Sequence, residues 1–524
     1  MASLLKTLLP AALLLAPTAK AAQPQRYLEV VTRFVETMME KGTDRYGRVH
    51  SPLFAALLDL NTLSLPLSKC PDELRPNPSG MVISVGQGLP EMPVGVRASD
   101  RAPLGNNLAT DVMLLRAMYE LSSLTGNSRY AAHADAYLRF WINHCQNPET
   151  GLMYWGEHAS WDFLEERGFG DVHEVDRQFP FYEKLYAMEP YKTLKFADAL
   201  WISQIGNKRV GDFSRHAGID HHKPDVGWGF TRHAGFYIWA YAHAYVESRD
   251  PKFLERADTL IESRVGKRAR PYSLILDPDF KPETYPDPAF RLLLWDSAAL
   301  VPEPQHTAWR KIVRELDEQA FAATTPQSWP WSKKEPGEAE KARKSRERWQ
   351  RLYPSLLKHG RVFPPNGSLQ ADSTTLSPLW NMGYGSSGGC GKALLNYHRY
   401  KQTGDMRFFR LAQEIAGQYL AEGFPKDPGD LWPKAAGLVI SLMVSLSREE
   451  PVPRLERSRY LAFAQEVADK SIQLFSKNGL FRADGLAEHY EAITGADDLL
   501  WGLLQLYCEL ARPEHPLPHN SVNW

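Results

Sequence analysis

The sequence predicts an all-α protein, an (α/α) toroid in which about six helical hairpins close into one ring, with long loops covering one end. Two observations favour this fold class. Helical periodicity dominates wherever Pro and Gly are infrequent, whereas continuous strand patterns are scarce. In addition, an amphipathic helix, a short polar turn and a second helix follow one another three times, at residues 119–135, 245–258 and 400–413.

The expected helices share a stripe of apolar residues at three- and four-residue spacing. In chain order they are 27–40, 108–124, 128–145, 191–205, 232–248, 251–264, 393–402, 407–421, 457–475 and 497–510. The turns of the three repeated hairpins carry Gly126, Asp250 and Gly404, each of which can end one helix or cap the next. These turns indicate antiparallel helix pairs.

The connections between hairpins favour a ring over an open solenoid, whose connections would be short and uniform. Every second connection is long and rich in Trp, Tyr, His, Gly and Pro, namely 43–104, 146–188, 206–230, 266–286, 324–391 and 422–434. Long loops alternating with short turns are expected when one end of a toroid carries the site. Within the fifth loop, the charge-dense residues 324–360 predict a solvated helical excursion.

The first residues predict a secretory signal. Residues 1–6 carry one positive charge, residues 7–17 are apolar, and Ala19 and Ala21 supply the small side chains that signal peptidase requires. We therefore expect a signal peptide at 1–21, a single toroid domain at 22–524, and a secreted or periplasmic protein that has no membrane contact after cleavage. The sequence leaves the oligomeric state open.

Composition narrows the function. Hydrophobic residues make up 43% of the 524 residues, which excludes a disordered chain. The formal net charge is −1, so the chain has no overall positive charge that would attract nucleic acid. Aromatic residues make up 11%, which fits either a large aromatic core or faces on which sugar rings stack. The four cysteines are too few and too far apart for a disulfide-scaffolded fold, although one or two bridges stay open: Cys70, Cys145, Cys390 and Cys508.

The densest group of chemistry-bearing residues follows the second helix of the first repeat. Tyr154, Trp155, Glu157 and Trp161 are predicted to contact substrate, with His158 among them as a catalytic residue. Two Trp, a Tyr, a His and an acid this close together are hard to bury as ordinary core. The alternative interpretation is an aromatic plug around a hydrogen-bonded His.

A second group opens the next repeated hairpin. His233 and Tyr237 stand four residues apart and share a helix face, and Arg232 can pair with a carboxylate through its planar fork. Trp228 precedes them as a predicted substrate contact, and Asn107 places an amide at the mouth of an earlier helix. We predict catalytic roles for Asn107, Arg232, His233 and Tyr237. A core imidazole is the alternative for His233, and helix capping is the alternative for Asn107.

Two further motifs carry weaker signals. The glycine-rich residues 381–389 lack the Lys and the spacing of a phosphate-binding loop, so we interpret them as a tight loop that presents Tyr384 to substrate. Asp220, His221 and His222 invite a metal interpretation, but consecutive residues rarely point at one ion. The sequence therefore predicts no metal site and no cofactor, with a structural divalent cation left as an open alternative.

Three stretches carry a family resemblance. Residues 44–54, 155–163 and 232–237 look like those of secreted bacterial proteins labelled pectate-lyase-like, and the chain is more broadly similar to toroid polysaccharide lyases and six-hairpin glycosidases. The resemblance implies a polysaccharide lyase whose partner is an anionic, uronate-containing polysaccharide or oligosaccharide. In such lyases an Asn or Arg neutralises the uronate carboxylate and a His or Tyr handles protons.

These residue types suit β-elimination. The C5 proton of a uronate becomes acidic once cationic or amide donors hold the neighbouring carboxylate, and a Tyr or His can then remove it. Hydrolysis by a carboxylic acid pair, drawn from Glu157, Asp162 and Asp111, is the alternative, and a non-catalytic glycan-binding protein is a third hypothesis. For either enzyme, we expect His158 and His233 to lie in one cleft.

Overall fold

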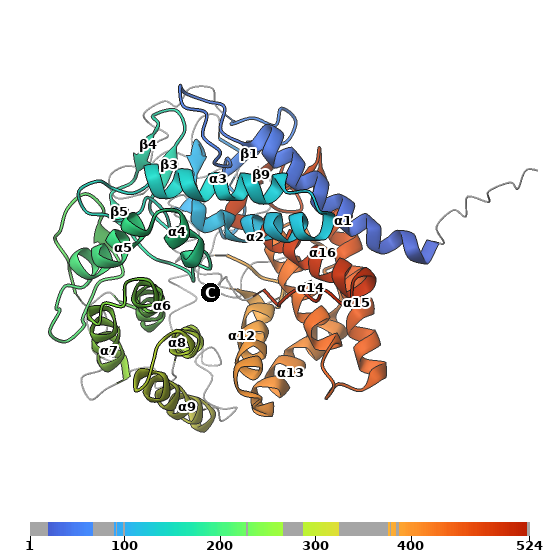
Figure 1. The fold of residues 1–524 in the computed structure, drawn as a ribbon. Coiled ribbons are helices and arrows are strands. Elements are labelled where there is room, and N and C mark those ends of the chain that lie inside the picture. Colours follow the sequence, from blue (N-terminus) through green and yellow to red (C-terminus); the bar gives the residue numbers. More distant parts are fainter. Residues whose placement is uncertain are drawn as a thin grey trace, which may run out of the picture.

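A computed structural model describes residues 19–66, 89–90, 92–97, 100–226, 229–265, 287–323, 376–377, 379–383 and 387–520. Its helices form a ring with an inner and an outer layer (Figure 1). The inner layer comprises α2 (Leu108–Thr125), α4 (Tyr182–Met188), α6 (Thr231–Ser248), α8 (Pro288–Leu300), α12 (Gly388–Thr403), α14 (Pro433–Ser447) and α16 (Ala496–Ala511). The predicted fold class, an all-α toroid, is thus confirmed.

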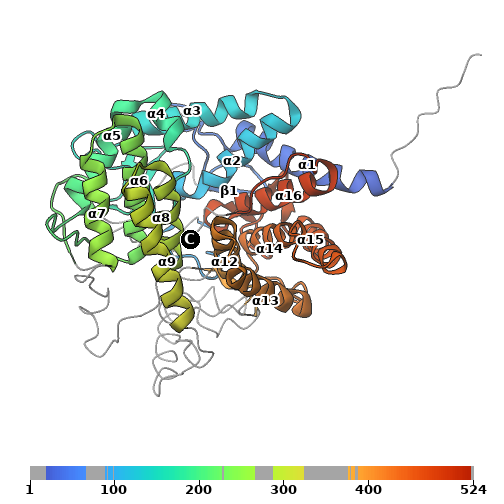
Figure 2. The ribbon, with the colours of Figure 1, turned by 60° about the horizontal axis from the view of Figure 1, so that its bottom comes forward.

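The outer helices pack against inner partners that are next to them in the chain, except α1, which packs mainly against α16. They are α1 (Ala19–Thr37), α3 (Arg129–His144), α5 (Pro190–Ala199), α7 (Lys252–Val265), α9 (Gln305–Ala323), α13 (Met406–Glu422) and α15 (Arg454–Phe475), and two π-helical segments, η1 (Met38–Gly42) and η4 (Leu200–Gln204), extend α1 and α5. Figure 2 shows the pairs α6/α7, α8/α9, α12/α13 and α14/α15 side by side.

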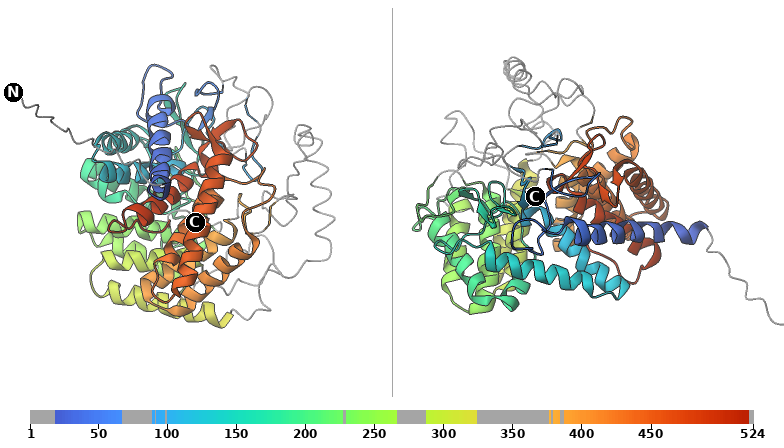
Figure 3. Two further views of the ribbon diagram at one scale, coloured as in Figure 1. Left: turned by 90° about the vertical axis from the view of Figure 1, so that its right-hand side faces the viewer. Right: turned by 90° about the horizontal axis from the view of Figure 1, so that it is seen from above.

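The ring is closed by elements from opposite ends of the chain. Helix α16 packs against α2, and α1 lies along the outside of the ring beside α16 (Figure 3). Strand β1 (Leu57–Asp59) pairs with β9 (His489–Glu491) across the same junction, and η7 (Ala492–Thr494) leads from β9 into α16. Beginning and end of the chain therefore share one core.

The three repeated hairpins are confirmed as α2/α3, α6/α7 and α12/α13. Gly126 and Gly404 end α2 and α12 in the left-handed conformation, with φ of 71° and 73°. In the middle hairpin Arg249 takes that conformation (φ 57°), and the Asp250 carboxylate accepts a 3.0 Å hydrogen bond from the backbone N–H of Lys252. Asp250 thus caps the start of α7.

Four of the described helices are absent from the sequence prediction: α4, α8, α9 and α14. All residues of α14 but one are buried, and α8 buries every residue from Ala289 to Ala298 except Asp296, so apolar periodicity has little polar contrast in either helix. Helix α4 has only 7 residues, which is too short for an apolar period to be recognised in the sequence. Helix α9 does alternate apolar and charged residues, so its pattern was present in the sequence.

Short strands occur in the long connections at the end of the ring where the inner helices begin. Strands β2 (Gly105–Asn106), β3 (Ser160–Asp162) and β4 (Arg167–Phe169) form one sheet, β5 (Val172–His173) pairs with β6 (Ala217–Gly218), and β7 (Ser476–Lys477) pairs with β8 (Leu480–Phe481). The first two of these sheets, with the loops that join them, build the site described below.

Residues 512–520 fold back from α16 into the ring. The indole N–H of Trp501 donates to the Pro518 carbonyl (3.1 Å), and the Asn520 amide donates to the Asp498 carboxylate (2.6 Å). Asn520 also donates its backbone N–H to Ser441 on α14 (2.9 Å). The segment thereby ties α14 to α16 from the inside.

Several expectations fall partly outside the described residues. The predicted cleavage point after residue 21 lies in the first turn of α1, while 1–18 and the predicted excursion 324–360 are not described. Cys145, Cys390 and Cys508 are buried free thiols, and Cys70 lies outside the described residues. Among the described helices, none combines the length and apolar character that crossing a bilayer requires.

Candidate functional site

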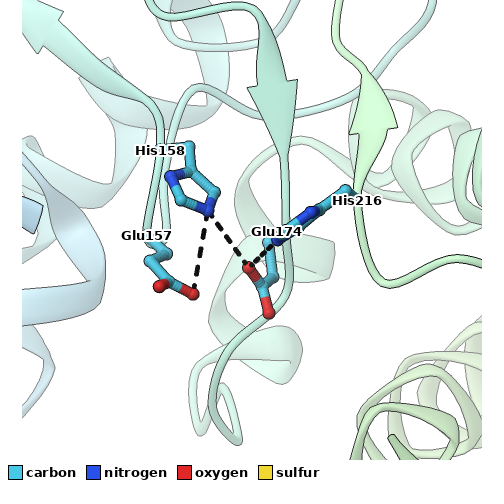
Figure 4. Close-up of side chains that lie close together, drawn as sticks. All are labelled: Glu157, His158, Glu174 and His216. Atoms are coloured by element: carbon cyan, nitrogen blue, oxygen red, sulfur yellow. Dashed lines mark hydrogen bonds and ion pairs between the residues drawn. The ribbon is translucent and has the colours of Figure 1, made fainter. Parts of the chain in front are cut away.

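Four side chains converge where the loops of the first two sheets meet: Glu157, His158, Glu174 and His216 (Figure 4). One nitrogen or oxygen from each lies within 4.8 Å of all the others. Glu174 is buried, Glu157 and His158 are mostly buried, and the His216 side chain is 37% exposed. The cluster therefore has a buried floor and one side open to solvent.

Strand pairing brings Glu174 and His216 together although 42 positions separate them. His173 on β5 lies opposite Ala217 on β6 in an antiparallel register. Glu174 directly follows β5 and His216 directly precedes β6, so this register places them opposite each other. The Nε2 atom of His216 lies 3.0 Å from Oε2 of Glu174.

Two glycines bring the loop of Glu157 and His158 against this strand pair. Gly156 has φ +91°, and a Cβ there would lie 2.3 Å from the Glu174 carbonyl oxygen. Gly170 has φ +98°, and a Cβ there would lie 2.2 Å from the His158 carbonyl oxygen. Any larger residue at either position would push His158 away from Glu174.

Asn107 fixes the same loop from the start of α2. Its side-chain oxygen accepts from the backbone N–H of Ala109 and from that of Gly156, both at 3.1 Å, and its amide donates to the Gly156 carbonyl at 2.5 Å. Asn107 is 5% exposed. It is therefore both a helix cap and an anchor for the site loop, and its position does not match a direct substrate contact.

The Glu174 carboxylate is the centre of the site. Its Oε1 lies 2.8 Å from Nε2 of His233 and 3.2 Å from Nε of Arg215. Its Oε2 lies 3.0 Å from Nε2 of His216 and 3.8 Å from Nε2 of His158. The two oxygens thus face different groups.

The electrostatics match this arrangement. Burial alone would raise the pKa of Glu174, but hydrogen bonds from His216 and His233 hold that pKa well below its ordinary value. Burial lowers the pKa of His158 to about 4, more than the nearby Glu174 charge raises it. At neutral pH the site therefore presents an ionised carboxylate and a neutral imidazole.

Two imidazoles and two carboxylates are a donor set suited to a divalent transition-metal ion, since Ca²⁺ and Mg²⁺ prefer oxygen ligands alone. The cluster of Glu157, His158, Glu174 and His216 fits such an ion, because each residue directs one donor atom to the same small volume. Binding would require His216 to carry its proton on Nδ1, because coordination of the ion would replace the contact of Nε2 with Glu174.

His158 and His233 approach the same carboxylate through different oxygens, so the two residues expected in one cleft do lie close together, but His233 is fully buried and does not line an open cleft. Arg232 is half-buried and lies over the Phe230 ring, 4.4 Å from its centroid. Arg215 lies over the same ring at 4.7 Å. The two arginines are therefore neighbours beside the cluster.

Three of the predicted ligand-facing residues lie in the core instead. Trp155 is 2% exposed, packs against Trp141 and donates to His173, while Trp161 is 7% exposed. Tyr237 is fully buried, and its hydroxyl has no hydrogen-bond partner among the described residues. Because no ring face is open to a sugar, we assign these three residues to packing.

The remaining predicted residues give mixed results. Tyr154 is half-buried, with its ring over Gly168 and its hydroxyl accepting from the Asn147 amide (3.2 Å). Trp228 and Tyr384 lie outside the described residues. The Asp220, His221 and His222 motif does not converge on one point. His221 pairs with Asp220 at the surface, whereas His222 bonds to Ser203.

Sequence reasoning missed Glu174, Arg215 and His216. The chain contains two Arg-His pairs in neighbouring segments, Arg215-His216 and Arg232-His233. This repetition is a sequence signal for Arg215 and His216 but not for Glu174. No regular spacing in the sequence links Glu174 to His216, because the two residues meet only through the pairing of β5 with β6.

Residues 92–234 match a family model described as periplasmic pectate lyase, and this segment contains all four cluster residues. A pectate disaccharide-lyase from Dickeya dadantii (strain 3937) is 29% identical over 131 residues, which make up 24% of this chain and 24% of that protein. The chain thus aligns with about a quarter of the length of this curated relative.

Among solved structures, the GH76A α-1,6-mannanase from Salegentibacter sp. HEL1_6 has a TM-score of 0.39 at 11% identity, covering 92% of this chain and 99% of that one. The cellobiose 2-epimerase from Bacillus thermoamylovorans B4167 has a TM-score of 0.42 at 10% identity, covering 92% and 99%. An unsaturated glucuronyl hydrolase specific for heparin has a TM-score of 0.37 at 12% identity, covering 94% and 99%. Over residues 92–234, the chain resembles the periplasmic pectate lyases, as its motifs indicated.

Proposed function

We propose that this protein cleaves a uronate-containing polysaccharide of the pectate class by β-elimination, in the periplasm or outside the cell. The observation that carries the proposal is the convergence of Glu157, His158, Glu174 and His216 within the segment that matches periplasmic pectate lyases. We further propose that these four residues hold a divalent cation. As a Lewis acid, a bound cation would neutralise the substrate carboxylate and make the C5 proton acidic.

The chain's own residues would then orient the reacting sugar. Arg215 and Arg232 lie beside the cluster over the Phe230 ring, and the Arg215 side chain is 12% exposed. We place these two arginines against the sugar, where a planar guanidinium can bind a carboxylate through two parallel hydrogen bonds. Arg215→Lys and Arg232→Lys keep the charge but lose this geometry. The variant that loses activity while keeping cation affinity identifies the substrate contact.

Hydrolysis has weaker support from the same residues. Asp111 is fully buried and accepts from Asn106 and Tyr137, and burial raises its pKa to about 7. Asp162 is 5% exposed and accepts from two backbone N–H groups of the following turn. Asp111 is fully buried beside Asp497, and Asp162 is buried and caps a turn, so neither presents its carboxyl group to an open site.

The test is digestion of polygalacturonate by the full chain, followed by the absorbance of the unsaturated uronate product and by the number of new reducing ends. We expect the absorbance to rise, to stop on addition of a chelator and to return with Mn²⁺. His216→Ala should abolish it, whereas His221→Ala, a nearby surface histidine paired with Asp220, should not.

The alternatives predict other products. New reducing ends without absorbance would assign the protein to the hydrolases. Saturable binding with no change in substrate length would make it a glycan-binding protein. Screening alginate, glucuronan, ulvan and glycosaminoglycans beside polygalacturonate would identify the uronate class.

A further inference from the structure

We infer that His233 is a positioning residue, which holds Oε1 of Glu174 so that Oε2 is presented to the cation. This inference rests on the proposed cation site. It gives His233 a role different from proton exchange with substrate, which its sequence context suggested.

The two carboxylate oxygens of Glu174 have different partners, and we infer a different role for each. Oε1 faces His233 at 2.8 Å and Arg215 at 3.2 Å, while Oε2 faces the two candidate ligands, His216 at 3.0 Å and His158 at 3.8 Å. A carboxylate only accepts hydrogen bonds, so Nε2 of His233 carries the proton and donates it to Oε1. This contact fixes the rotation of the carboxylate about its last bond.

His233 is well placed to act as a rigid support. It lies in the first turn of α6 and is fully buried, so substrate cannot reach its ring. Phe230 stacks on the imidazole and Phe236 meets it edge-on, both with ring centroids 5.7 Å away. Because both aromatic rings pack against the buried imidazole, we expect it to keep its orientation whether or not the site holds a cation.

Residues that bond to metal ligands in this way govern affinity, and their loss costs about 10- to 100-fold in metal binding. His233→Phe keeps the ring and removes the donor. His233→Gln restores a donor at the reach of Nε2, whereas His233→Asn is too short to reach Glu174. His243 provides a control because it lies buried on the same helix, against Trp239 and Tyr182, and has no carboxylate partner among the described residues.

The experiment measures Mn²⁺ binding to the full chain at neutral pH, together with melting temperature. We expect His233→Phe and His233→Asn to bind Mn²⁺ about 10- to 100-fold more weakly, with His233→Gln and His243→Phe within a few-fold of wild type. Excess Mn²⁺ should restore lyase activity to His233→Phe, which a purely structural defect would not allow.

Folded His233→Phe with wild-type Mn²⁺ affinity would overturn the inference. If His233→Phe does not fold, equal affinities of the Asn and Gln variants would overturn it instead. A wild-type protein that produces unsaturated uronate without binding Mn²⁺ would refute the positioning role and leave the lyase function standing. A wild-type protein that binds Mn²⁺ without lyase activity would refute only the function.

Discussion

Gly156→Ala should damage both stability and the site, and the structure gives the size of the effect. At φ +91° an alanine costs about 1–2 kcal/mol of backbone strain. Its Cβ would lie 2.3 Å from the Glu174 carbonyl oxygen, so the loop must withdraw by about 0.7 Å to reach the 3.0 Å that real contacts respect. Forcing extra volume into such packing costs a further ~1–3 kcal/mol. We expect a loss of about 3 kcal/mol of unfolding free energy.

The displacement also carries Glu157 and His158 away from Glu174, and a misplacement near 1 Å can lower turnover about 100-fold. Gly126→Ala is the matched control, since Gly126 has φ +71° but a methyl group at that position would meet no atom within 4 Å. This variant should lose only the stability that the backbone strain costs, and it should keep full activity. The assays are urea unfolding followed by circular dichroism, Mn²⁺ titration and uronate absorbance. Equal losses in the two variants would refute the idea that close approach at Gly156 shapes the site.

Three further predictions concern residues around the site. Asn107→Asp keeps the cap acceptor of α2 but loses the donor to the Gly156 carbonyl, so activity should fall more than stability. Asn107→Ala should lower both, with about 1 kcal/mol of stability lost from the cap alone. Equal activity in wild type and Asn107→Asp would contradict the anchoring role. Tyr237→Phe removes a buried hydroxyl that bonds to no other residue in the described part of the chain, so urea stability and turnover should stay unchanged. A fall in turnover of about 100-fold or more would return Tyr237 to the mechanism. Burial lowers the pKa of His243 from 6.5 to about 4, so the unfolded chain binds a proton at this histidine before the folded chain does as pH falls. The free energy of unfolding should therefore drop by up to about 3 kcal/mol between pH 6.5 and pH 4. His243→Phe should flatten that part of the curve of unfolding free energy against pH.

The ring was predictable because its outer helices are amphipathic and its hairpin turns are short. Glycine turns such as Gly126 and Gly404 mark helix ends by local rules that need no tertiary information. The inner helices α8 and α14 obey a different rule. Most of their residues are buried, so their sequences show little of the polar contrast by which helix and strand could be told apart.

The site was half predictable for a related reason. Glu157 and His158 stand in a conspicuous cluster with aromatic residues, but in the structure the aromatic members Trp155 and Trp161 turn inward. Glu174 and His216 flank two-residue strands, which are too short to leave a pattern in sequence. Their partnership depends on register between distant segments, and register is a tertiary property.

The junction between α2 and α16 has a consequence for how this protein is made. The pairing of β1 with β9 joins residues more than 400 positions apart, so elements that are synthesised late complete a surface formed by elements synthesised early. Folding that depends on such distant contacts is slow, and the open intermediate exposes apolar surface until the ring closes. The segment that carries the candidate site, residues 92–234, contributes only an arc of this ring. Expressed alone, that arc would lack most of α6 and would leave the face of α2 that packs against α16 uncovered, so work on the site should begin from the whole chain.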